Sequence, residues 1–414
     1  EAAALYAESS TFFTNSAQLL NVAKLVRSPI GYVTAIRDEL KCAPPPPPTI
    51  PSVWPMFQKD ARHSGLADVS GPPFATSTDV RVKWQKTIVP FGGLSFPLIG
   101  SDGTIYVSLT AGMASPNLFA FDGEIGEEKW QTRIPGTMGG GAIGPDGTLY
   151  FCGGNGGSRL TAINPTNGTT IWSFAGGGPG VCSHPIIGKD GTIYTTSTSS
   201  VAAAIRTDGT EKWRHMDSNA SRPALSKDES QVYVSFGRHL TALDSQTGRV
   251  IWVRTGPRHA NEPIIVDAED RVLAVAPPDF AGDVGAITAY SKSGSQLWQQ
   301  FLGGDLRFAT LLPNGNVLAV SHIALTILNA SDGFILSSVF LPAGIFVQIP
   351  IVDKDGIVYL PFSNFAIPQH GVMAFVGGNI RWNFITPSAP SGVALGSNGT
   401  IYVSSQDTLF ALGE

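Results

Sequence analysis

Short apolar stretches alternate with turn residues along most of the chain, and this alternation repeats as a unit. A unit has a run of the type Asp-Gly-Thr-Ile-Tyr, a second apolar strand, a second turn and a tryptophan. The clearest copies start at Asp102, Asp146, Asp190 and Asp355. Successive tryptophans stand roughly 39 to 46 residues apart. Repeats of this length with two hairpin turns predict the four-stranded blades of a β-propeller.

The tryptophans also predict the number of blades. Units end at Trp130, Trp172, Trp213, Trp252, Trp298, Ser337 and Trp382, so that Ser337 stands in place of a missing tryptophan. The last unit, 383–414, lacks its outermost strand, and residues 79–85, which contain Trp84, can supply it. Joining the first and last strands in one blade closes the ring and removes its free edges. We therefore predict an all-β fold, an eight-bladed β-propeller of four-stranded blades.

The turn after the innermost strand is an Asp-Gly or Asn-Gly pair in most units. Such pairs suit type I′ hairpins, which need positive φ at both positions. The fourth unit has Asp228-Glu229-Ser230 at this point, and the fifth has Glu269-Asp270. We expect longer or looser hairpins in these two blades.

The N-terminal part of the chain has a different pattern. We divide the chain into a helical N-terminal arm (1–43), a proline-rich linker (44–52), a lead-in segment (53–78) and the propeller (79–414). Ser16 and Ser28-Pro29 are helix start signals in the arm. They are followed by apolar residues at helical spacing, among them Leu19, Leu20, Val26, Val33 and Leu40.

There are two alternatives for the surface that buries the apolar face of the arm. The arm can pack as a helical hairpin against the propeller of its own chain. It can also dock on another protein subunit, including a copy of this chain, because the prolines of the linker favour a stiff polyproline II spacer. Blade faces are already buried by neighbouring blades, which favours the second alternative.

Composition excludes two classes of partner. Hydrophobic residues make up 43% of the chain, yet no apolar run approaches the length of a membrane span. The net charge is −5, and no cluster of Lys and Arg stands out. We expect neither a membrane span nor a nucleic-acid partner.

Several features indicate a secreted or cell-surface protein. The chain starts at Glu1 without a methionine or a signal-like segment, as expected of a processed mature form. Asn-x-Ser/Thr sequons, candidates for N-glycosylation, occur in predicted turns at Asn167, Asn219, Asn329 and Asn398. The alternative is that asparagine serves in these turns only as a turn residue.

The chain has three cysteines, Cys42, Cys152 and Cys182, without the Cys-x-x-Cys spacing of a metal or redox site. Cys152 ends the second strand of one predicted blade, and Cys182 begins the innermost strand of the next. Both ends belong at the same rim of adjacent blades, so a disulfide between them is geometrically possible. Two buried free thiols that pack as small apolar groups are the alternative.

The segment Trp54-Pro-Met-Phe-Gln-Lys-Asp-Ala-Arg-His-Ser-Gly65 precedes the first unit. It resembles the lead-in of bacterial proteins built from pyrroloquinoline-quinone-like propeller repeats, and the repeat itself resembles the same superfamily. That superfamily includes quinoprotein alcohol dehydrogenases and the outer-membrane assembly lipoprotein BamB. The resemblance covers residues 53–414 and implies the fold rather than an activity.

The central channel holds the candidate binding residues. Aligned on the Asp-Gly turn, the inner positions are mostly small or polar, as expected of a solvated funnel. His184, Arg222 and Glu262 come from consecutive blades, with Arg258, His259 and Asn261 just upstream of Glu262 and Arg307 in the next blade. These residues predict a pocket for an anion or a carboxylate, with Arg222 as the clamp. The alternative is a network of paired charges at a wet channel mouth.

The resemblance to quinoprotein dehydrogenases implies a cofactor site that the residues do not match. That pattern includes adjacent cysteines, a calcium held by Glu, Asn and Asp, and a tryptophan beneath the quinone. The chain has no adjacent cysteines, and its repeat tryptophans stand at strand ends. We therefore expect no pyrroloquinoline quinone, no calcium or other metal, and no catalytic residues.

The sequence thus favours a secreted, non-catalytic propeller that acts as a structural or protein-interaction module in a larger assembly. A quinone-dependent oxidoreductase and a carbohydrate- or peptide-binding propeller remain as alternatives.

Overall fold

The computed structural model describes residues 53–88, 93–110, 116–135, 137–154, 159–175, 182–197, 201–217, 220, 222–255, 264–278, 284–365 and 367–414. The chain divides into two units, Glu1–Ile50 and Pro51–Glu414. The arm predicted for residues 1–43 and the linker predicted for 44–52, with Leu19, Leu20, Val26, Val33 and Leu40, lie outside the described residues.

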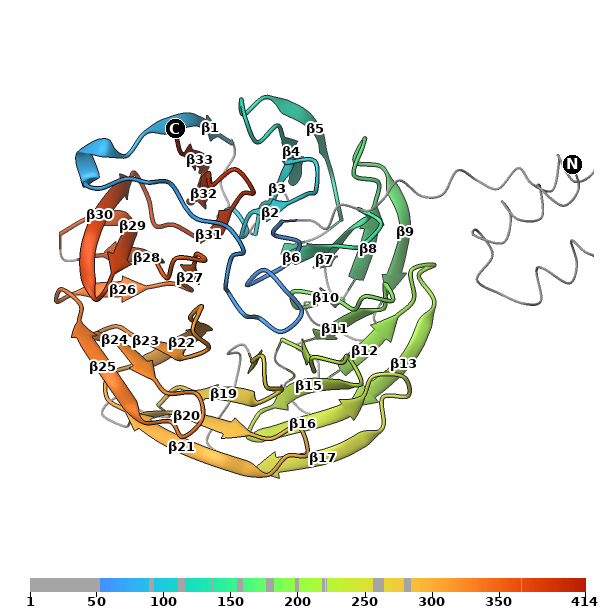
Figure 1. Ribbon diagram of the computed structural model, residues 1–414. Coiled ribbons are helices and arrows are strands. Elements are labelled where there is room, and N and C mark those ends of the chain that lie inside the picture. Colours follow the sequence, from blue (N-terminus) through green and yellow to red (C-terminus); the bar gives the residue numbers. More distant parts are fainter. Residues whose placement is uncertain are drawn as a thin grey trace, which may run out of the picture. The chain divides into compact units, whose positions relative to one another are not determined.

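Eight antiparallel sheets surround a central channel in the second unit (Figure 1). Blade 1 has β2 (Leu98–Ile99), β3 (Ile105–Ser108), β4 (Leu118–Phe121) and β5 (Glu128–Thr132); blade 2 has β6 (Thr137–Ile143), β7 (Leu149–Gly154), β8 (Arg159–Ile163) and β9 (Thr170–Ala175). Blade 3 has β10 (Ile186–Ile187), β11 (Ile193–Ser197), β12 (Val201–Ile205) and β13 (Glu211–Met216); blade 4 has β14 (Ala224–Leu225), β15 (Gln231–Phe236), β16 (His239–Asp244) and β17 (Val250–Thr255).

The second half of the ring is built in the same way. Blade 5 has β18 (Ile264–Val266), β19 (Val272–Ala276), β20 (Gly285–Tyr290) and β21 (Gln296–Leu302); blade 6 has β22 (Leu306–Leu311), β23 (Val317–Ser321), β24 (Ala324–Leu328) and β25 (Ile335–Phe340). Blade 7 has β26 (Ile345–Val347), β27 (Ile351–Val352), β28 (Val358–Asn364), β29 (Gln369–Val376) and β30 (Asn379–Thr386); blade 8 has β31 (Gly392–Leu395), β32 (Ile401–Ser404), β33 (Thr408–Leu412) and β1 (Val82–Thr87). A short 3-10 helix, η1 (Ser77–Asp79), precedes β1. The eight-bladed prediction is confirmed.

The ring is closed by the first and last strands of the propeller. β1 pairs antiparallel with β33, with Val82 opposite Leu412 and Thr87 opposite Thr408. Blade 8 therefore has the order β1-β33-β32-β31. The predicted closing strand around Trp84 is confirmed, and it runs two residues past the predicted end.

One cross-strand row explains the tryptophan repeat. In blade 1, Tyr106 lies opposite Ala120, and Ala120 lies opposite Trp130. The small alanine leaves room for the indole, whose Nε1 donates to Pro165 O of the next blade at 2.8 Å. The same bond to the following blade is made by the Nε1 atoms of Trp84, Trp172, Trp213, Trp252 and Trp298. The tryptophans thus join neighbouring blades.

Each of these indoles needs a glycine beneath it. Gly126 has φ +71°, and a Cβ built there would lie 2.6 Å from the ring of Trp84. Only glycine combines this left-handed backbone with so close an approach of the ring. The Gly that recurs a few residues before each tryptophan is therefore an inter-blade contact as well as a turn residue.

The prediction of type I′ hairpins is wrong. Gly103 has φ +78°, while Asp102 is not among the residues with positive φ. Gly100 O accepts the Gly103 N–H and Gly100 N donates to Thr104 O, which makes a three-residue loop with glycine at the left-handed position. The aspartate is favoured for another reason, because Asp102 Oδ1 accepts the N–H of Thr104 at 3.0 Å.

The expectation of longer hairpins holds in one of the two blades. In blade 4, Ser226 N donates to Gln231 O, so the loop is one residue longer than in blade 1. In blade 5, Asp267 N donates to Arg271 O, which is the ordinary length. Glu229 and Asp270 take the left-handed place of glycine, with φ of 59° and 63°.

Candidate functional site

The lead-in segment lies inside the propeller rather than beside it. We call Trp54–Ala67 the central plug, and Figure 1 shows it as the blue loop in the middle of the ring. Backbone carbonyls of the plug accept N–H groups from the inner strands of blades 2, 4, 5, 6 and 7. The pairs are Pro55 with Ile143, Ala61 with Leu225, Arg62 with Val266, Ser64 with Leu311, and Gly65 with Val352. The plug therefore ties distant blades together at the channel.

Phe57 is the centre of the plug and is 1% exposed. The guanidinium carbon of Arg222 lies 4.4 Å from its ring centroid. The rings of Phe96 and His184 lie 5.0 and 4.9 Å away, centroid to centroid. A cation over an aromatic face at this distance is attracted by the ring quadrupole, most strongly where water is excluded.

Arg222 and His184, two residues of the predicted anion pocket, are in contact. Arg222 Nε donates to His184 Nδ1 at 3.2 Å. His184 therefore accepts through Nδ1 and is neutral. Burial and the positive charge of Arg222 hold the pKa of His184 well below its ordinary value of 6.5. His184 also packs against the backbone of Gly140, where a Cβ would collide with the imidazole.

A second histidine, His63, belongs to the plug and was not among the predicted site residues. It is fully buried, with φ 56°. Its Nδ1 lies 3.0 Å from Ile264 O, so Nδ1 carries the proton, because a carbonyl oxygen can only accept. Burial lowers the pKa of His63 to about 4. Its Nε2 is buried without a hydrogen-bond partner.

A cavity of about 640 Å³ borders this cluster, and Arg222 and His184 are part of its lining. Its described lining combines the charge of Arg222 with aromatic rings and neutral polar groups, and contains no Asp or Glu. The lining includes Ser95, Phe96, His184, Arg222, Phe308, Gln348 and Ser391. The arrangement suits an anionic or hydrogen-bonding ligand, and the described lining residues offer no carboxylate to act as a base or to hold a cation.

Of the other predicted channel residues, the described one, Arg307, does not join this cluster. Arg307 pairs with Asp305, with Nη2 2.5 Å from Oδ2, and His322 Nε2 lies 3.2 Å from the same carboxylate oxygen. Arg307 is not part of the described lining of the cavity. Arg258, His259, Asn261 and Glu262 lie outside the described residues.

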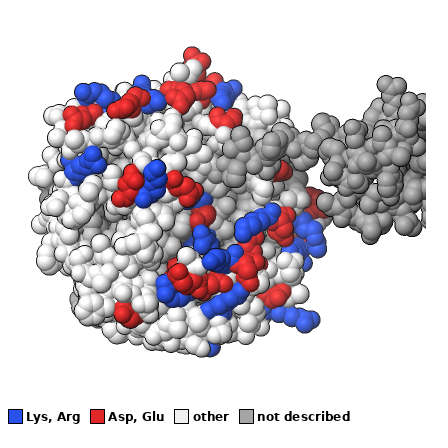
Figure 2. All heavy atoms as spheres, viewed as in Figure 1, with Lys and Arg blue, Asp and Glu red and all other residues white. Residues whose placement is uncertain are grey.

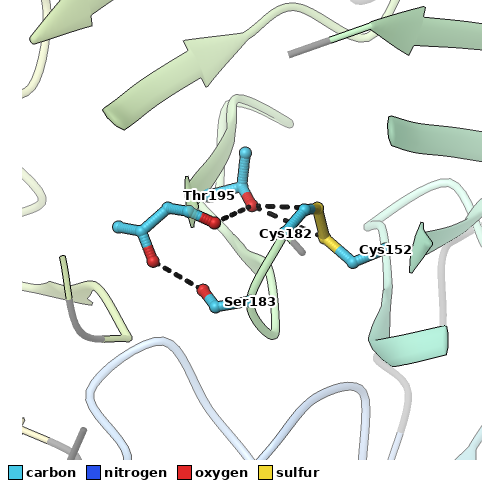
Figure 3. Close-up of a disulfide and its surroundings, with 5 residues drawn as sticks. Cys152, Cys182, Ser183 and Thr195 are labelled. Carbon is cyan, nitrogen blue, oxygen red and sulfur yellow. Dashed lines mark hydrogen bonds between the residues drawn. A yellow bond between two sulfur atoms is a disulfide. The ribbon is translucent and has the colours of Figure 1, made fainter. Parts of the chain in front are cut away.

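Cys152 and Cys182 are joined by a disulfide between blades 2 and 3, with Cα atoms 5.3 Å apart (Figure 3). Thr195 lies beside it: its Oγ1 is 3.5 Å from the sulfur of Cys152 and 3.4 Å from that of Cys182. Ser183, next in the chain, bonds through Oγ to Thr196 Oγ1 at 2.6 Å. The disulfide therefore links blades 2 and 3 near their inner strands.

The described sequon asparagines act in turns. Asn167 Oδ1 accepts the N–H of Thr169 at 3.0 Å, and Asn329 Oδ1 accepts that of Ser331 at 2.8 Å. Asn398 is exposed and its Oδ1 accepts the N–H of Thr400 at 3.0 Å. These bonds agree with the role of asparagine as a turn residue, and N-glycosylation at the three sites stays a prediction. Asn219 lies outside the described residues.

Comparison with known proteins gives a family match across the propeller. The family model described as outer membrane protein assembly factor BamB matches residues 77–180, 116–277 and 197–414. A curated relative, the outer membrane protein assembly factor BamB of Yersinia pestis, is 24% identical over 245 residues. The alignment covers 52% of this chain and 59% of that relative, so the chain spans less than two thirds of its length.

Solved structures share the fold. BamB from Moraxella catarrhalis superposes with a TM-score of 0.56 at 14% identity, covering 81% of this chain and 100% of that one. Quinohemoprotein alcohol dehydrogenase from Comamonas testosteroni gives 0.64 at 12% identity, covering 91% and 82%. The Dos1 propeller gives 0.62 at 10% identity, covering 82% and 96%. At such identities the likeness concerns the architecture alone.

Proposed function

The chain belongs to the family described as outer membrane protein assembly factor BamB, and from this membership we propose that it is a non-catalytic structural and protein-interaction module. It works as one subunit of a larger assembly on the cell surface or the periplasmic side of the envelope. Its partners are other protein subunits, including copies of itself.

The observation that carries this proposal is the central plug. The channel, where a propeller can hold a ligand, is crossed by the chain's own Phe57, and Arg222 and His184 are paired with each other. Hydrogen bonds from the plug to inner strands around the ring favour a rigid body. A rigid ring presents its rims, loops and outer strands to partners.

The described residues do not fit the quinone cofactor found in part of the superfamily. Cys152 and Cys182 come from different blades and form their own disulfide, so they do not supply an adjacent pair. Among the described lining residues of the cavity, none is a carboxylate that could hold calcium. We therefore do not propose that the chain is a quinone-dependent oxidoreductase, and we assign it neither a quinone nor calcium.

The disulfide supports the proposed location. Structural disulfides persist in oxidising compartments, such as the periplasm and the cell exterior, and are rare in the cytosol. Within the described part of the chain, no helix is long and apolar enough to cross a membrane. The N-terminal arm, residues 1–43, is the proposed link to neighbouring subunits through Leu19, Leu20, Val26, Val33 and Leu40.

A second candidate function rests on the cavity. Its volume of about 640 Å³ lies within the range of roughly 300–1,000 Å³ that is usual for small-molecule sites. The guanidinium of Arg222 faces it beside neutral polar groups, so a carboxylate of a peptide or an acidic sugar is the ligand chemistry that fits. Such binding would be compatible with an assembly role.

The test is to isolate the tagged full-length chain from envelope membranes at its natural level of expression. We expect it to elute in a complex with other subunits in constant ratio, and to show no dye reduction with added quinone, calcium and alcohol. A chain that elutes only as a free monomer would overturn the proposed function, and quinone-dependent turnover would restore the enzyme alternative.

A further inference from the structure

Blade 6 lacks the cross-strand pair of alanine and tryptophan that the other seven blades share. At the same register, Leu318 lies opposite Ile327, and Ile327 lies opposite Ser337. In the neighbouring blade 5 the corresponding pair is Ala289 and Trp298. Blade 6 therefore has a large residue where the others have alanine and a small one where they have tryptophan.

The exchange leaves a cavity between blades 6 and 7. We call it the aromatic notch and define it by Leu318, Ile327, Ser337, Val358, Phe375 and Gly378, which line a volume of about 500 Å³. Ile327 does not fill the space that an indole takes elsewhere. The turn of blade 7 contributes Gly377 and Gly378, both with positive φ and without a Cβ. Val376 pairs directly with Asn379, so this is a two-residue turn, shorter than the loops beneath the other indoles, but it likewise places glycine at the notch.

We propose that the aromatic notch receives an aromatic side chain, tryptophan above all, from a partner protein; this inference rests on the proposed function. The occupant follows from the architecture. Between blades 5 and 6, Trp298 packs on Gly333 and donates from Nε1 to Ala330 O at 2.9 Å. Between blades 6 and 7, Val339 Cγ2 takes the place over the glycine, 2.6 Å from a Cβ built at Gly378. This smaller side chain leaves the notch open, and its lining adds the polar residues Asn314, Lys354 and Asp355 to the apolar ones.

The surroundings of the notch suit a protein partner. β25 has no charged residue, and Leu336 and Phe340 on it are 49% and 79% exposed. Phe334, just before β25, is 69% exposed. Figure 2 shows the flank of the ring over β25 as largely free of charged side chains in this view. An aromatic anchor in a pocket amid apolar surface is the usual energetic centre of a protein interface.

The experiment fills the notch with the alanine and tryptophan pair that the other blades have. The double variant Ile327→Ala/Ser337→Trp restores the pair found in the other blades. We expect it to melt at or above the wild-type temperature, because the new indole buries apolar area. 5-Fluoroindole, followed by fluorine NMR, should bind the full-length wild-type chain saturably, and its affinity should fall at least tenfold in the double variant.

The matched control is Ala289→Ile/Trp298→Ser, which should open a second notch between blades 5 and 6 and add a second site for 5-fluoroindole. The partner is then identified by comparing the subunits that copurify with the wild type and with the filled variant, Ile327→Ala/Ser337→Trp. We expect the filled variant to lose one identified subunit, and 5-fluoroindole to displace the same subunit from the wild type.

Retention of every subunit by the filled variant would overturn the notch and leave the proposed function intact. Equal binding of 5-fluoroindole by the wild type and the filled variant would also overturn it. A wild-type chain that recovers no subunit at all would instead refute the proposed function, and with it a partner for the notch.

Discussion

Arg222 donates a hydrogen bond to His184 at 3.2 Å, and both side chains pack against Phe57 of the central plug. The contact joins blades 3 and 4 to the central plug. It gives the partly buried imidazole of His184 a hydrogen-bond donor and places a cation against an aromatic face. The pair that the sequence suggests as a ligand clamp is therefore also a structural bond of the ring.

The first prediction concerns Phe57. Truncating a fully buried phenylalanine removes its apolar contacts and leaves a cavity, so Phe57→Ala should lower the free energy of unfolding by about 3–5 kcal/mol. Urea denaturation measures the change. Phe340, which is 79% exposed, provides the control: Phe340→Ala should stay within about 0.5 kcal/mol of wild type. A similarly small effect at Phe57 would contradict the structural role of the plug.

The second prediction concerns pH. Burial lowers the pKa of His63 to about 4 from 6.5, so below pH 6.5 the unfolded chain binds a proton that the folded chain does not. The stability that His63 contributes is complete above pH 6.5 and falls as the pH drops toward 4, by on the order of 3 kcal/mol in total.

His184, whose pKa is lowered in the same direction, adds to this slope. The comparison is therefore between the wild type and His63→Asn, in urea denaturation at pH 7, 5.5 and 4. The variant should lose part of the stability at pH 7 and show a shallower decline with acid. Parallel curves for the two proteins would show that His63 does not titrate as described.

The sequence predicts features that rest on contacts between residues close together in the chain, and it does not predict features that rest on contacts between distant residues. The blades were predictable because Trp130, Ala120 and Tyr106 repeat locally at a fixed spacing. The plug was not, since its bonds run from backbone carbonyls such as Ser64 O to strand ends far along the chain. In the sequence the plug is recognisable only as the Trp54–Gly65 segment. No local pattern shows that this segment lies inside the ring.

The same reasoning applies to the finer features. The absence of a tryptophan at Ser337 is visible in the sequence, but the notch depends also on Ile327 and on the turn at Gly377 and Gly378 of the next blade. The Asp-Gly pairs indicated tight turns correctly. They could not distinguish a two-residue loop from a three-residue loop with a left-handed glycine, because both conformations favour the same residues.

The third prediction separates two causes of lost stability when a glycine is replaced by alanine: the left-handed backbone and the collision with an indole ring. Gly103 and Gly126 both have positive φ, but a Cβ at Gly103 meets nothing within 4 Å, whereas one at Gly126 meets the ring of Trp84. Gly103→Ala should cost about 1–2 kcal/mol for the left-handed backbone alone. Gly126→Ala should cost a further 1–3 kcal/mol or so for the displaced indole. Thermal or urea unfolding checks both, and equal losses would contradict the inter-blade role of Trp84.

The fourth prediction concerns the disulfide. Peptide mapping after alkylation without reductant should leave Cys152 and Cys182 unlabelled and joined. Their sequence separation is 30, for which a disulfide typically contributes about 3–4 kcal/mol by limiting the unfolded chain. Cys152→Ala/Cys182→Ala should therefore melt at a lower temperature than wild type. Labelling of both thiols in protein from the native compartment would favour the free-thiol alternative and weaken the proposed location.

The last prediction concerns the N-terminal arm, and it follows from where apolar surface can be buried. Leu19, Leu20, Val26, Val33 and Leu40 would each contribute about 1.5–3 kcal/mol on full burial. Most apolar surface of the ring is already buried, since its blade faces pack against one another and the plug crosses its channel. Short helices are also marginal alone in water, so a neighbouring subunit is the expected acceptor.

Deleting residues 1–48 should accordingly leave a folded ring, because the plug begins at Trp54 and all described blade contacts remain. The truncated chain should keep the wild-type melting temperature within a few degrees and lose its place in the complex, as size-exclusion chromatography and native mass measurement would show. A truncated chain that unfolds would indicate packing of the arm on its own ring. One that still assembles normally would assign assembly to the ring itself, and the aromatic notch would then be the first surface to examine.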